Sequence, residues 1–143
     1  AITAGCANMG PSMAILTGLL GGFVVVGSSV LLESVLKIDD PVGAIAAHGF
    51  TGAWGTLAVG LFAQEAYGGT NGLFFGGGAG LLGAQFVGVA AAFIFVFATS
   101  FIVFKAIDLT IGMRVSEEEE KTGLDVTEHS ASGYPDFANV KMD

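Results

Sequence analysis

Three long stretches of this chain are almost free of charge, and they constrain its fold more than any other feature. Met13–Leu32 and Leu73–Phe104 contain no charged side chain, and Pro41–Gln64 is interrupted only by His48. About 20 apolar residues suffice for a helix to cross a membrane, whereas helices this long in a soluble core normally keep a polar face. The sequence therefore predicts an all-α integral membrane protein rather than a soluble helical core. We expect the spans at about residues 11–36, 41–64 and 73–112.

The third stretch is longer than a membrane requires. At 1.5 Å per residue, Leu73–Phe104 would be roughly 48 Å long if it were wholly helical, and the hydrocarbon core is only about 30 Å thick. We expect a strong tilt, a projection beyond the bilayer, or a helix that begins only after the glycine-rich segment Gly76–Gly80.

Charge divides the chain into two parts. The formal net charge is −8, but most of the acids follow residue 112. We predict a transmembrane region over residues 1–112 and an acidic tail in water over residues 113–143. No basic patch is present to bind nucleic acid, and the single cysteine, Cys6, excludes an internal disulfide and a CxxC metal site. Because the chain starts at Ala1 without an initiator Met or a signal-peptide pattern, we expect a piece of a longer protein.

The basic residues near the spans predict the orientation. Lys37 lies between the first two spans, and Lys105, Arg114 and Lys121 follow the third, whereas the loop Glu65–Gly72 has no basic residue. Short loops rich in Lys and Arg stay on the cytoplasmic side. We therefore expect a multi-pass protein of the plasma or inner membrane, with the C-terminal tail in the cytoplasm.

Asp40 stands directly before Pro41, at the expected cytoplasmic start of the second span. Proline is favoured as the first residue of a helix, and an aspartate before it can cap free N–H groups and complement the helix dipole. Capping alone would account for Asp40.

His48 is the most informative residue of the chain. It follows Asp40 by eight positions, which corresponds to about 12 Å along a helix and places it near the middle of the bilayer. Polar groups at that depth normally face a cavity, a partner or a transport path. Gly49, Gly52 and Gly55 follow at three-residue spacing and leave one side of the helix with little bulk, which suits a narrow pore. The alternative is a histidine that only hydrogen-bonds to a neighbouring helix.

Other chemistry is not apparent in the sequence. It contains no nucleotide-binding loop, metal-ligand cluster or catalytic triad, so we expect no enzymatic activity, no cofactor and no metal. Trp54 is interpreted as a packing or interface residue.

The segment Asp39–Phe62 resembles the DDPxxxxxxHGxxGxxG signature of the ammonium transporters, the Amt/MEP/Rh family. The opening Ala1–Cys6 resembles the loop before the ninth helix of that family. Asp108–Val115 and the acidic segment after it, with Gly123-Leu124-Asp125, resemble its last helix and cytoplasmic tail. The resemblance covers essentially the whole chain, in order.

This resemblance implies an eleven-helix protomer with an inverted repeat, assembled as a homotrimer with one pore in each protomer. The chain would supply helices nine to eleven and the tail, and the remaining N-terminal helices of the protomer would be its partners. His48 would be the second of the paired pore histidines, Ala44 would line the apolar lumen, and Asp40 would be the conserved acid at the start of the tenth helix.

The implied function is ammonium transport by deprotonation, conduction of ammonia through the apolar pore, and proton transfer through histidine. The alternatives are a passive ammonia or carbon dioxide channel of the Rh type and an ammonium sensor built on the same fold. In the tail, the resemblance implies that Gly123 and Asp125 contact neighbouring protomers and that Thr127 is a phosphorylation position. PII-type signal proteins are the other regulators that it implies, at the cytoplasmic face.

Overall fold

The computed structural model describes residues 2–133, which are helices joined by short loops, without a strand in that range. Three helical segments in this part of the chain are long and apolar enough to cross a membrane. These are Pro11–Leu36, Ile45–Phe62 and Gly80–Thr110. The predicted all-α membrane class is confirmed.

The chain divides into two compact units, residues 1–96 and residues 97–143. The elements of the first unit are η1 (Thr3–Gly5), α1 (Pro11–Val30), η2 (Leu31–Leu36), η3 (Ile45–Phe50), α2 (Thr51–Phe62), α3 (Glu65–Gly68), η4 (Leu73–Phe75) and the beginning of α4 (Gly80–Thr110). The elements of the second unit are the rest of α4, α5 (Glu117–Thr122) and α6 (Leu124–His129).

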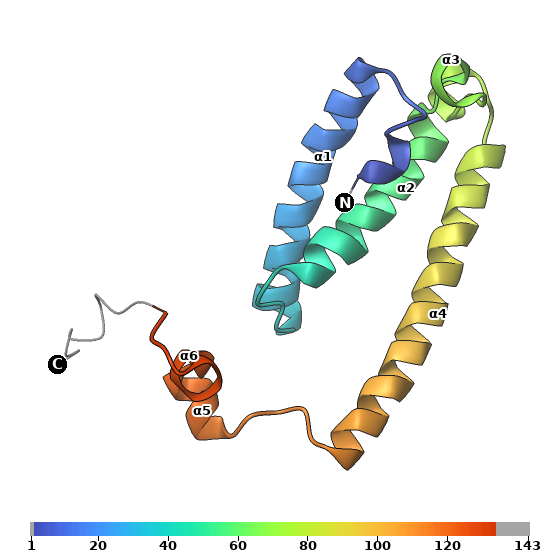
Figure 1. Cartoon of the computed structure of the whole chain (residues 1–143). Coiled ribbons are helices and arrows are strands. Elements are labelled where there is room, and N and C mark those ends of the chain that lie inside the picture. The colour runs from blue at the N-terminus through green and yellow to red at the C-terminus, as the bar shows by residue number, and fades with distance from the viewer. Residues whose placement is uncertain (1, 134–143) are drawn as a thin grey trace. The chain divides into compact units, whose positions relative to one another are not determined.

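The first two spans lie side by side and run in opposite directions (Figure 1). Pro11 stands in the first turn of α1 after the extended residue Gly10, where its missing N–H is not needed. Gly21 brings the two helices together, because a Cβ there would already lie 3.6 Å from Cγ2 of Thr51 and 3.7 Å from Cδ1 of Trp54. A small residue at such a contact is the usual basis of close helix packing in lipid.

The second span begins later than the sequence suggested. Pro41 and Val42 form a turn, and the helical segment starts at Ile45. Gly43 has φ +65°, a left-handed conformation that an α-helix cannot contain, and its N–H donates to the carbonyl of Asp40 at 2.9 Å. The expectation that Pro41 is the first helical residue is therefore wrong.

The third span starts late, which is one of the three outcomes expected for it. Gly76 and Gly78 have φ +84° and +69° and keep the chain irregular before α4. The helix still has 31 residues, or about 46 Å. None of its residues is buried within the described part of this chain.

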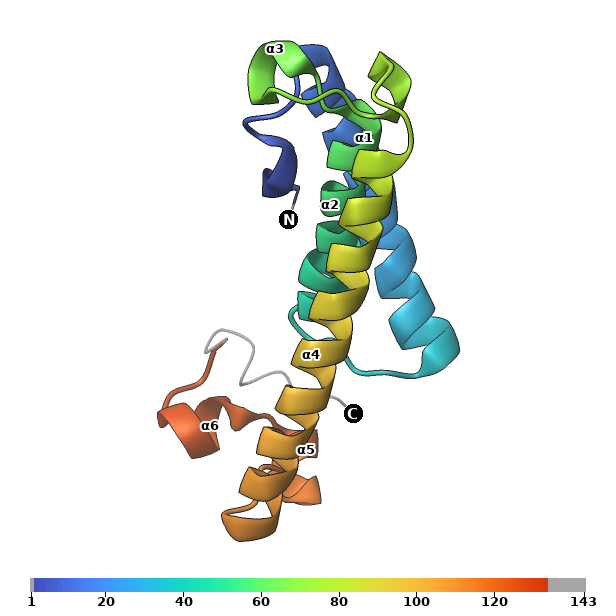
Figure 2. The ribbon, with the colours of Figure 1, turned by 90° about the vertical axis from the view of Figure 1, so that its right-hand side faces the viewer.

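Loops tie together the end of the first span at Pro11 and the end of the second span at Phe62. The N–H of Gln64 donates to the carbonyl of Asn8 at 2.8 Å, and the N–H of Gly10 donates to Oε1 of Gln64 at 2.7 Å. The segment from α3 to the start of α4 crosses over the end of α2 (Figure 2), where the N–H of Gly72 donates to the carbonyl of Ala63 at 2.8 Å. This end of the first unit is thus held by backbone groups of three separate segments.

The second unit contains a capping box that the sequence analysis missed, although Ser116-x-x-Glu119 is its ordinary signature. The N–H of Glu119 donates to Oγ of Ser116 at 3.3 Å, and the N–H of Ser116 donates to Oε2 of Glu119 at 2.9 Å. The hydroxyl and the N–H of Ser116 lower the pKa of the Glu119 carboxyl. The short helix α5 thereby begins at Glu117.

Candidate functional site

His48 lies in η3, a π-helical segment at the start of the second span, and its side chain is exposed on the surface of this chain. Among the described residues its imidazole forms no hydrogen bond. Ala44, one turn earlier, is exposed as well. Because a neutral imidazole carries one donor and one acceptor, His48 has its full hydrogen-bonding capacity available to groups outside this chain.

The position of His48 along the second helix differs from the expected one, whereas its depth in the membrane stays a prediction. The helix begins at Ile45 and not near Asp40, so His48 lies about 5 Å from its start rather than about 12 Å. The whole segment to Phe62 has 18 residues and rises about 27 Å, close to the hydrocarbon thickness of about 30 Å. His48 is thus within the span but in its first turn.

The three glycines after His48 do not share one face. Gly49 is exposed, Gly52 is partly buried and Gly55 is buried. Residues three apart on a helix differ by about 60° in direction, so this row turns from the open side of the helix toward its packed side. Only the beginning of the row lies beside His48.

Asp40 caps the second span, but at a different register from the one predicted. Its side chain is buried, and its carboxylate accepts hydrogen bonds from the N–H groups of Ile45 at 3.1 Å and Ala46 at 3.0 Å. The hydrogen bond from Ala46, followed by that from Ile45, holds the pKa of Asp40 below its ordinary value against the opposing effect of burial. The chain folds back between Asp40 and Ile45, so the carboxylate reaches N–H groups five and six residues later.

Thr51 closes the other end of the π-helical segment. Its N–H bonds to the carbonyl of Ala46, five residues earlier, and its hydroxyl donates to the same carbonyl at 2.9 Å. Both side chains are buried. The sequence analysis missed Thr51, because an isolated threonine in an apolar helix carries no signal that separates this role from ordinary packing.

Trp54 is a packing residue, as interpreted from the sequence. Its Nε1–H donates to the carbonyl of Thr17 in α1 at 3.0 Å, and its ring meets that of Phe62 edge to face, with centroids 6.4 Å apart. The hydrogen bond satisfies an indole N–H that would otherwise be unpaired between two apolar helices.

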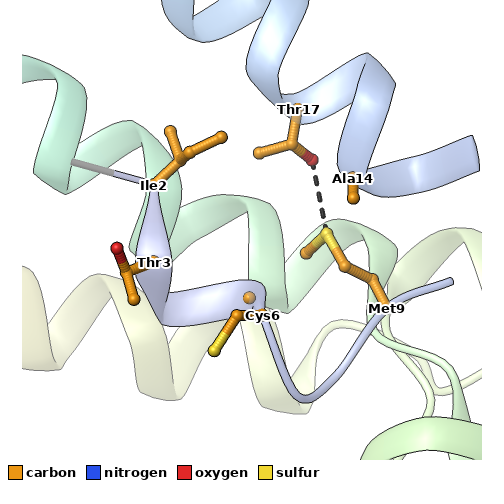
Figure 3. A pocket seen from close by; sticks show the side chains of 7 residues that line it. Ile2, Thr3, Cys6, Met9, Ala14 and Thr17 are labelled. Atoms are coloured by element: carbon orange, nitrogen blue, oxygen red, sulfur yellow. Dashed lines mark hydrogen bonds between the residues drawn. The ribbon is translucent and has the colours of Figure 1, made fainter. Parts of the chain in front are cut away.

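A pocket of about 210 Å³ lies between the N-terminal segment and α1 (Figure 3). Its lining residues are Ile2, Thr3, Gly5, Cys6, Met9, Ala14 and Thr17. The hydroxyl of Thr17 donates to the sulfur of Met9 at 3.4 Å across it. The walls are mostly apolar, and the lining residues include no carboxylate.

The three tail residues singled out in the sequence occupy different positions. Gly123 ends α5 with φ +98° and separates it from α6, as expected of a boundary glycine. Asp125 lies in the first turn of α6, and its carboxylate accepts the N–H of Gly133 at 2.9 Å. It therefore ties the chain after α6 back to the helix, and its role as a cap of α6 stays a prediction. Thr127 is exposed.

Comparison with known proteins adds independent information. The family model described as Ammonium Transporter Family matches residues 1–134. The ammonium transporter Amt2 of Archaeoglobus fulgidus is 40% identical over 96% of this chain and 30% of its own length, and an ammonium transporter of Bacillus subtilis is 38% identical over 95% of this chain and 34% of its own.

A solved structure, titled Sensor Amt Protein, aligns with 85% of this chain at a TM-score of 0.73 and 39% identity, and 29% of its own length is covered. The chain thus spans about a third of the length of the relatives that it matches. The similarity extends over nearly all of the chain and includes its three apolar helices.

Proposed function

Because this chain belongs to the ammonium transporter family, we propose that its second span forms part of a pore through which the complete protein carries ammonium across the membrane. The observation that supports this proposal most directly is His48, a polar side chain exposed within an apolar span and without a hydrogen bond among the described residues. Polar groups inside a membrane usually mark a transport path.

The mechanism follows from the cost of moving an ion into an apolar pore. Ammonium cannot keep its charge there without a very large penalty in free energy. If it gives up a proton, neutral ammonia passes along apolar groups such as Ala44, and the proton needs a separate route. Imidazole suits that route because its pKa lies near neutrality and its two nitrogens can accept and donate in turn. His48 would be one half of the relay, and a second histidine in the rest of the protomer would be the other.

Two other functions remain as alternatives. A passive channel of the Rh type would conduct ammonia or carbon dioxide without moving charge. A sensor is favoured by one observation, the similarity of this chain to the solved structure of the Sensor Amt Protein. A sensor would bind ammonium in the same pore and use it to change a signalling partner.

Electrical recording on liposomes that hold the complete protein tests the proposal. We expect a pulse of ammonium to evoke an inward current that saturates with concentration, because net positive charge crosses when both ammonia and the proton pass. Methylammonium at equal concentration serves as a second substrate, and sodium as the control ion. Absence of current despite ammonia flux would favour the passive channel, and binding without flux would favour the sensor.

Asp40→Asn should loosen the start of the second span. An amide offers only one acceptor oxygen, so either Ile45 or Ala46 loses its hydrogen-bond partner. We expect faster hydrogen exchange at residues 45–46 in the variant, measured by mass spectrometry on the complete protein. Asp39→Asn is the matched control, because Asp39 is exposed beside it.

The same contact predicts a dependence on pH. The pKa of Asp40 is lowered from 3.8 in the folded protein, so its stabilisation is complete above the unfolded pKa and is lost as the pH falls through the lower folded value. Wild-type exchange at residues 45–46 should therefore approach that of Asp40→Asn only in acid. Equal hydrogen exchange at residues 45–46 in wild type and in Asp40→Asn at neutral pH would argue against the role of Asp40 as a cap.

The tail is the proposed regulatory segment, on the cytoplasmic side and within a homotrimer. Thr127 is exposed and close in sequence to Asp125 and Glu128. A phosphate there would add about −1.5 to −2 charges, and repulsion from these acids would release a docked tail. A PII-type signal protein at the cytoplasmic mouth is the other regulator that we propose.

A further inference from the structure

We infer that Thr51 is a positioning residue for His48, which it orients by holding the π-helical turn between Ile45 and Phe50 in register. The inference rests on the proposed pore role of His48. Thr51 itself is buried and is not one of the pore-facing groups proposed above, His48 and Ala44.

One residue, Ala46, is held through both of its backbone polar groups in this turn. The N–H of Ala46 donates to Oδ2 of Asp40 at 3.0 Å. The carbonyl of the same residue accepts both the N–H and the hydroxyl of Thr51, the latter at 2.9 Å. Ala46 has no exposed surface, and Asp40 and Thr51 are each 5% exposed, so water does not compete for these bonds. His48 projects from the opposite, open side of the turn.

The π geometry decides the direction of His48. A π turn bonds residues five apart and so contains one residue more than an α turn. If the turn relaxed to α geometry, the residues before it would rotate relative to α2 by one residue, about 100°, and His48, which lies inside the turn, would rotate by a part of that angle. Such a rotation would turn an imidazole on the open side well away from its original direction, and a proton relay needs its partners in line.

The hydroxyl of Thr51 favours the π turn because a carbonyl with two donors has both lone pairs satisfied. Its methyl group points to α1, where the contact with Gly21 leaves space for it. The residue is thus fixed by packing on one side and by its hydroxyl on the other. Thr56 offers a comparison, since its hydroxyl donates to the carbonyl of Gly52 at 3.0 Å in the ordinary α-helical part of the span.

The test uses the complete transporter in liposomes. Thr51→Val keeps the shape of the side chain and removes the hydroxyl. We expect its ammonium-evoked current to fall about fivefold, the effect of one lost hydrogen bond, and the midpoint of the current–pH profile to move away from that of wild type as the direction of His48 changes. Thr51→Ser, which retains the hydroxyl, and Thr56→Val should both stay within about twofold of wild type with an unchanged midpoint.

A loss of assembled protein lowers the amplitude of the current but leaves the midpoint of its pH profile unchanged. A shift of that midpoint therefore indicates that Thr51 positions His48. If Thr51→Val does not assemble, Thr51→Ala, which adds no bulk toward Gly21, is judged by the same two readouts. A Thr51 variant without the hydroxyl that matches Thr56→Val in current and midpoint would overturn the inference. If His48→Ala is inactive in that experiment, the pore role of His48 survives whatever Thr51 does; if His48→Ala keeps its current, the pore role of His48 fails and the inference about Thr51 fails with it.

Discussion

His48→Ala is expected to abolish the ammonium-evoked current of the complete transporter while leaving the protein assembled. The methyl side chain can neither accept nor donate a proton, so the proton separated from ammonium loses its route. A positioned acid–base group contributes about 10²- to 10⁴-fold to a proton-transfer step. After a loss of that size, we expect the remaining current to be too small to detect in a liposome recording. Because the His48 side chain is exposed on this chain, its removal leaves no cavity within the packed first unit.

The second histidine of the chain is the matched control. His129 ends α6 in the tail and is exposed, so His129→Ala should retain wild-type current. Size-exclusion chromatography in detergent shows whether each variant still assembles. Normal current in a correctly assembled His48→Ala variant would reduce His48 to a residue that only packs against a neighbouring helix.

Gly60→Ala should destabilise the protein, because the second and third spans meet there without room for a side chain. A Cβ at position 60 would lie 2.5 Å from Cα of Leu82 and 3.0 Å from its Cδ1. The backbone of α4 would have to move away, since a Cα atom has no rotamer to change. Overpacking of this kind typically costs about 1–3 kcal/mol, which we expect as a loss in the free energy of unfolding measured in detergent.

Gly88→Ala separates the clash from the general effect of adding a methyl group to a helix. Both positions are helical, so each substitution gains the same helix propensity, about 1 kcal/mol. A Cβ at position 88 meets no described atom within 4 Å, and this variant should be at least as stable as wild type. Equal stability of the two variants would show that the first turn of α4 does not press on α2 at Gly60.

The sequence by itself determined the membrane class and, for the described part of the chain, the number of spans; it also singled out His48, the residue that we propose for the pore. Hydrophobic length decides whether a helix crosses a membrane, and it is a local property that needs no knowledge of contacts. A histidine inside an apolar stretch is conspicuous for the same reason. The capping box at Ser116 and Glu119 was equally local, and its spacing in the sequence was sufficient to predict it.

Only the tertiary structure decided where the second span begins and which groups hold it. Gly43 turns the chain after Pro41, so Asp40 caps Ile45 and Ala46 rather than the residues next to it. The π turn closed by Thr51 has no periodic signature, because one extra residue in a helix leaves its composition unchanged. The cap and the π turn depend on hydrogen bonds between particular backbone and side-chain groups. The distance between these groups in space cannot be read from their distance along the chain, and a hydropathy pattern does not contain it.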